Sequence, residues 1–78
     1  MNSEEQTQQL AITLINHLKN KTRDTWVVKL YNGDKFTVKA ISATYCQGSE
    51  GTTSTLTYFN ELLNQTDVLD LFHVKEIA

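Results

Sequence analysis

Three lysines and one tyrosine lie close together in the chain, around an Asn32-Gly33 pair, in an arrangement suited to nucleic acid. These residues are Lys29, Tyr31, Lys35 and Lys39. If both flanking segments are strands, these odd-numbered side chains share a face, because side chains alternate along a strand. Lysines contact phosphates and an aromatic ring stacks on a base, as in proteins that hold single strands. The same pattern also describes an ordinary solvated strand face.

The residues capable of acid, base or nucleophilic chemistry are few and scattered. Cys46 needs a basic partner to become a nucleophile, and both histidines are remote from it in sequence. We therefore expect a buried structural thiol. Asp70 and His73 are three residues apart, but no nucleophile or orienting group accompanies them, so we expect surface residues beside a tight turn. His17 has no second ligand one helical turn away, which favours a solvated or helix-end histidine over a zinc ligand. The sequence predicts no catalytic residue, metal or cofactor, and hence no enzyme.

Length and composition indicate one small domain, residues 1–78. The core of a 78-residue chain supports a net stability of only a few kcal/mol. The single cysteine excludes an internal disulfide, which leaves oligomerisation as the route to extra stability. A formal charge of −2 gives no global attraction to nucleic acid or anionic lipid. No stretch approaches the ~20 apolar residues of a membrane span. The polar, acidic N-terminus and single cysteine predict a cytoplasmic protein without membrane contact.

The clearest structural signal is a hairpin centred on Asn32-Gly33, since both residues tolerate positive φ. Even-numbered apolar residues line one side of each flanking run. They are Trp26, Val28, Leu30, Phe36, Val38 and Ala40. A two-residue loop would place Leu30 opposite Lys35, so burial favours a three-residue or bulged turn.

That turn is expected to place Leu30 opposite Phe36 and Val28 opposite Val38. The resulting strongly bent ribbon is suited to a small closed barrel. The alternative is an open meander sheet.

An amphipathic helix is predicted over residues 3–20. Ser3 and Gln6 form a capping-box pattern. An apolar stripe follows at helical spacing, made of Leu10, Ala11, Leu14, Ile15 and Leu18. We expect this stripe to cover one end of the sheet; the alternative is packing against another chain.

The remaining chain predicts further strands within residues 25–78. Residues 41–47 continue the second strand, residues 48–54 form a polar loop, and residues 55–60 form a third strand. Residues 58–65 fit either a helix or a strand entering a turn, and we favour the latter, with the turn at residues 65–67. Residues 68–78 then predict a strand, a one-turn helical link and a short final strand.

This order of elements resembles the SH3-like barrels, and in particular the Sm/LSm group. The segment Val28-Lys29-Leu30-Tyr31-Asn32-Gly33-Asp34 is similar to the first Sm motif, and the spacing of Leu69, Leu71, Val74 and Ile77 is similar to the second. Val38 stands where the family usually has a second glycine, and Thr44 lies near the place of its aspartate. The resemblance therefore implies architecture and edge-to-edge assembly more than RNA binding.

The predicted fold is α+β and mostly β: an N-terminal amphipathic helix and a bent antiparallel sheet closing into a small five-stranded SH3/Sm-like barrel. The expected function is that of a non-catalytic interaction or assembly module of bacterial or phage type. Its partner is a second copy or another protein. The alternative is an Sm-like protein that binds RNA or another single-stranded nucleic acid through Lys29, Tyr31, Lys35 and Lys39.

Overall fold

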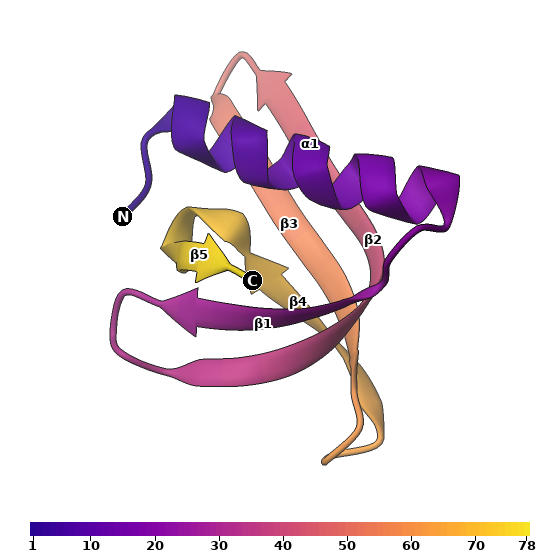
Figure 1. The fold of residues 1–78 in the computed structure, drawn as a ribbon. Coiled ribbons are helices and arrows are strands. Elements are labelled where there is room, and N and C mark those ends of the chain that lie inside the picture. Colours follow the sequence, from indigo (N-terminus) through magenta and orange to yellow (C-terminus); the bar gives the residue numbers. More distant parts are fainter.

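The computed structural model describes residues 1–78 as one helix packed on a five-stranded antiparallel sheet (Figure 1). The elements in chain order are α1 (Glu4–Asn20), β1 (Thr25–Leu30), β2 (Lys35–Gly48), β3 (Gly51–Asn60), β4 (Gln65–Asp70), the 3₁₀ turn η1 (Leu71–His73) and β5 (Val74–Ile77). The order across the sheet is β4-β3-β2-β1-β5. The predicted α+β, mostly β class is confirmed.

The N-terminal helix begins at the predicted capping box. The Ser3 side chain accepts a hydrogen bond from the Gln6 backbone, and the Gln6 side chain accepts one from the Ser3 backbone. The apolar stripe is buried within the chain itself, with Ala11 and Leu14 both fully buried in the main core cluster. The helix therefore covers the molecule's own sheet, as expected.

Removing the helix cap gives a modest, measurable effect. Ser3→Ala leaves the Gln6 backbone N–H without its partner, and we expect a loss of about 1 kcal/mol in the free energy of unfolding. Chemical denaturation monitored by far-ultraviolet circular dichroism measures this loss. Ser3→Asp, which keeps a cap acceptor, should retain most of the stability, and an equal loss in both variants would contradict the capping role.

The β1–β2 hairpin has the predicted three-residue turn. The Leu30 N–H donates to the Asp34 carbonyl at 2.8 Å, and Gly33 adopts φ +95°, a value that favours glycine. The predicted register, with Val28 opposite Val38, is nevertheless wrong by two residues. Val28 lies opposite Phe36, and Trp26 lies opposite Val38. The even-numbered residues still share the core face, since a shift of two preserves the alternation.

The main bend of the sheet comes from a bulge within β2. The register of β2 on β3 shifts between Ala40 and Ser42, so Ile41 is an extra residue and its side chain is half exposed. Beyond this bulge the alternation reverses, and Ala43 and Tyr45 pack toward the core in place of even-numbered residues. The predicted polar loop at residues 48–54 is wrong, because β2 and β3 pair as far as Gly48 opposite Gly51.

The predicted closed barrel is not formed. β4 and β5 are the two outer strands of the sheet and do not pair with each other. After the bulge, β3 and β4 follow the bent half of β2, so the two hairpins point in different directions in Figure 1. The chain then passes through η1, whose Leu71 is fully buried, to reach the far side of β1. The sheet is therefore open at both edges.

The C-terminal elements follow the predicted order of strand, one-turn link and final strand. Residues 58–65 form the end of β3, a turn and the first residue of β4, so the strand interpretation is confirmed over the helical one. The turn lies at residues 61–64 and not at 65–67, which belong to β4. Asn64 at the end of this turn has φ +51°, a conformation that asparagine tolerates.

Candidate interaction surfaces

The predicted lysines lie together on the face of the sheet that is turned away from the core. Lys29 is directly opposite Lys35 in the β1–β2 ladder, and Lys39 lies opposite Phe59 of β3. Only Lys29 has an acidic neighbour at ion-pair distance, with Nζ 3.9 Å from Glu76 Oε1. Both side chains of that pair are well exposed, so its contribution to stability is small.

Tyr31 does not join this lysine face. It lies in the hairpin turn, where its hydroxyl donates to the Asn2 side-chain oxygen and its N–H donates to the His73 carbonyl. The aromatic residue that pairs directly with one of the lysines is instead Phe59, opposite Lys39. Strand alternation in the sequence could not reveal this, because it specifies neither where β1 ends nor the register between β2 and β3.

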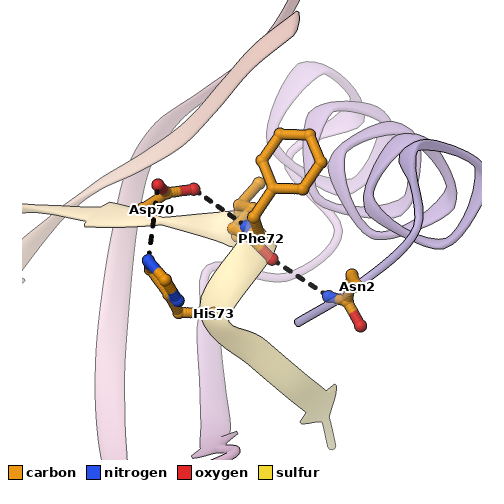
Figure 2. A network of polar contacts seen from close by, with 5 residues as sticks. Asn2, Asp70, Phe72 and His73 are labelled. Atoms are coloured by element: carbon orange, nitrogen blue, oxygen red, sulfur yellow. Dashed lines mark hydrogen bonds and ion pairs between the residues drawn. The ribbon is translucent and has the colours of Figure 1, made fainter.

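Asn2 anchors the N-terminal segment to the β4–β5 link (Figure 2). Its backbone N–H donates to the Phe72 carbonyl at 3.0 Å, and its side-chain amide donates to the carbonyls of Leu71 and Val74. The side chain is nearly fully buried. No local pattern in the sequence indicates this role, because the partners are about seventy residues away in the chain.

Asp70 and His73 lie at the two ends of the same link (Figure 2). Asp70 Oδ1 accepts a hydrogen bond from the Phe72 N–H at 2.9 Å and so caps the 3₁₀ turn, while its Oδ2 lies 3.7 Å from His73 Nε2. Both side chains are at least half exposed. They are surface residues beside a tight turn, as predicted, and the observed role of Asp70 is structural.

His17 lies at the C-terminal end of α1. Its Nδ1 is 2.8 Å from the Thr22 hydroxyl, and its ring meets the Trp26 ring edge-on, with the centroids 5.7 Å apart. Arg23 covers the same indole at 5.1 Å from the centroid. These contacts close the helix end over Trp26, and they confirm the prediction of a helix-end histidine.

Cys46 is exposed, so the predicted buried thiol is wrong. The bulge at Ile41 reverses the alternation and turns Cys46 outward, opposite Thr53. We therefore expect one thiol per chain to react with an aromatic disulfide reagent in the native protein at the rate of a free cysteine. Reaction only after denaturation would show that the thiol is buried. The Cys46→Ser variant, which has no thiol, is the control and should not react.

An open groove of about 750 Å³ separates the β1–β2 hairpin from the end of the β3–β4 hairpin. Phe36 and Tyr58 lie at its base, with ring centroids 6.2 Å apart. Lys35 and Lys39 line one wall. Leu62, which also lines the groove, is 94% exposed and is the most exposed large apolar residue of the molecule.

Burial raises the pKa of the Tyr58 hydroxyl above its ordinary value of 10.0, and the nearby Asp67 carboxylate adds to the shift. The folded state therefore favours the protonated phenol, and this contribution to stability is complete below pH 10. It is lost as the pH rises through the higher folded-state pKa. We expect the free energy of unfolding to fall above pH 10, and the fall to be smaller in Tyr58→Phe. Identical alkaline profiles would contradict this assignment.

Further apolar side chains are exposed along the β3–β4 hairpin. Leu63 lies beside Leu62 in the turn and is 62% exposed, and Val68, on the edge strand β4, is 65% exposed. Large apolar side chains exposed on an unpaired edge strand mark a site of association.

Neither the family models, the curated proteins nor the solved structures that were compared with this chain give a match. The helix α1 lacks the length and apolar character needed to span a membrane. No group of three or more histidine, cysteine or acidic side chains is arranged to hold a metal ion.

Proposed function

We propose that this protein is a non-catalytic interaction module that works through the free edges of its sheet, by pairing with a second copy or with another protein. The observation that carries the proposal is the unpaired edge of β4, which presents six residues of backbone together with the exposed side chain of Val68. A free strand edge offers a row of donors and acceptors that another strand can satisfy.

The other free edge, β5, is shorter and more strongly charged. It has four residues, of which Lys75 and Glu76 are exposed. Head-to-tail pairing of β4 with the β5 strand of the next copy would satisfy both edges at once. Such a heterologous contact closes into a ring when its rotation permits. This is also the assembly that the Sm/LSm resemblance implies, and both remain proposals.

Sedimentation velocity over a wide concentration range tests self-association. We expect assemblies larger than one chain at high micromolar concentration, and a shift to monomer in Val68→Lys, because an added charge on an edge strand opposes pairing. Ile41→Lys is the matched control: it replaces an exposed apolar residue on β2, which has neighbours on both sides. A strict monomer at every concentration would overturn self-association.

Binding of RNA or another single strand is the weaker alternative. Lys29, Lys35 and Lys39 share a face with Phe59, which supports it. Tyr31, however, lies apart from the lysines with its hydroxyl engaged, and the formal charge of the chain is −2. A titration with an oligouridylate tests this alternative.

A further inference from the structure

We propose that the groove between the two hairpins binds an extended acidic segment of a partner protein, which adds as a strand to the free part of β2. This site differs from the β4 and β5 edges, so it goes beyond the proposed assembly function. It predicts a class of partner: a peptide in which acidic and apolar residues alternate.

The first half of β2 has a neighbouring strand on one side only. Its pairing with β1 covers residues 35–39, whereas its pairing with β3 begins at Lys39 opposite Phe59. Residues 35–38 therefore face the groove where β3 has turned away. At about 3.3 Å per residue this is about 13 Å of strand edge.

The backbone groups that point into the groove can be identified from the hydrogen bonds to the β1 side. The Leu30 N–H donates to the Asp34 carbonyl and the Ala40 N–H donates to the Asp24 carbonyl, so even-numbered residues of this segment bond toward β1. In an antiparallel ladder the direction of these groups alternates from one residue to the next. The N–H and C=O of Lys35 and Thr37 therefore point away from β1, toward the groove.

The groove offers apolar contacts on its core side. Phe36, Tyr58 and the exposed Leu62 all line it, and the rings of Phe36 and Tyr58 lie close together. An added strand would direct alternate side chains toward these residues. Its apolar positions would thus cover Leu62, which has almost no cover in the free protein.

The charges beside the groove select an acidic partner. Lys35 and Lys39 flank Thr37 on the outer face, and Lys29 lies directly opposite Lys35. Glu61 is the one acidic residue that lines the groove. The peptide side chains that lie beside the two groove lysines would therefore be acidic, because opposite charges on adjacent strands attract.

The same charges argue against a second copy of this edge as the occupant. Antiparallel pairing of two β2 edges about Thr37 would place Lys35 of one copy beside Lys39 of the other, and like charges in that position are destabilising. Asn2 and Ala78 are already engaged within the molecule, since Ala78 pairs with Val27 and Asn2 with Phe72. We therefore assign the occupant to a segment of another protein.

Fluorescence polarisation with a labelled octapeptide of alternating glutamate and valine tests the proposal. We expect saturable binding that weakens with added salt, and a loss of at least tenfold in affinity when Lys35 and Lys39 are both replaced by glutamate. Lys75→Glu, which reverses a charge on β5, should bind as the unaltered protein does. An octapeptide of alternating lysine and valine should not bind.

Two further variants test strand addition itself. Thr37→Pro removes the N–H that points into the groove and should abolish binding, whereas Thr37→Val keeps it and should bind normally. Because the proline variant could fail to fold, two further peptides are used, one N-methylated at its odd-numbered amides and one at its even-numbered amides. Each has one edge that cannot donate hydrogen bonds. The peptide whose blocked edge faces β2 should lose affinity at least tenfold.

The proposal would be overturned if the acidic, basic and N-methylated octapeptides all bound equally, or if none of them bound. Binding of an oligouridylate by the lysines without binding of the acidic octapeptide would also overturn it and would favour the nucleic-acid alternative. The result is independent of the assembly proposal, because Val68→Lys should retain full peptide affinity even if it changes the oligomeric state.

Discussion

Replacing Leu14 by alanine is expected to lower the free energy of unfolding by about 2–5 kcal/mol. Leu14 is a residue of α1 and is fully buried in the core. Only 13 of the 78 residues are buried, so each core side chain contributes a large share of the buried surface. A domain of this size has only a few kcal/mol of net stability. The variant should therefore be largely unfolded at room temperature, as measured by urea denaturation with circular dichroism and tryptophan fluorescence.

The matched control for that prediction is Ile12→Ala. Ile12 lies on the same helix but is 40% exposed, so the change removes a similar volume without leaving a core cavity. We expect a loss well below that of Leu14→Ala. Equal losses in the two variants would show that α1 does not dock on the sheet as described.

The second large effect is expected for Asn2→Ala. The change leaves the carbonyls of Leu71 and Val74 and the Tyr31 hydroxyl without their observed partner. Each buried polar group left unsatisfied costs about 1–3 kcal/mol. We therefore expect a loss of stability comparable to a core deletion, measured by thermal unfolding.

Tyr31→Phe separates the contributions within this network. It removes the hydroxyl that donates to Asn2 but leaves both bonds from the Asn2 amide to the link in place. A loss smaller than that of Asn2→Ala is the expected result. If Asn2→Ala were as stable as the unaltered protein, the anchoring of the link by Asn2 would be contradicted.

The local features of the fold could be predicted from the sequence because they depend on neighbouring residues. Ser3 and Gln6 specify the helix start, and Asn32-Gly33 specifies the hairpin turn. The alternation around the turn placed Trp26 and Val28 correctly in the core. The change of spacing after Leu71 predicted the link between β4 and β5.

The features that were missed depend on contacts between distant parts of the chain. No local pattern marks Ile41 as a bulged residue, yet the bulge decides that Cys46 faces outward and that the long β2–β3 ladder bends. The strand order was also beyond local patterns, since β4 and β5 are the outer strands and do not pair with each other. For the candidate site, the lysines were predicted, but no local pattern shows that Phe59 and Leu62 line the same groove.

The binding groove requires that the first half of β2 has one free edge, and amide hydrogen exchange measured by NMR tests this most directly. In dilute protein, the amides of Phe36 and Val38, which bond toward β1, should exchange slowly. Those of Lys35 and Thr37 should exchange close to the rate of an unstructured chain. Protection of Lys35 and Thr37 equal to that of Phe36 and Val38 would mean that this edge is already paired, and would contradict the binding groove.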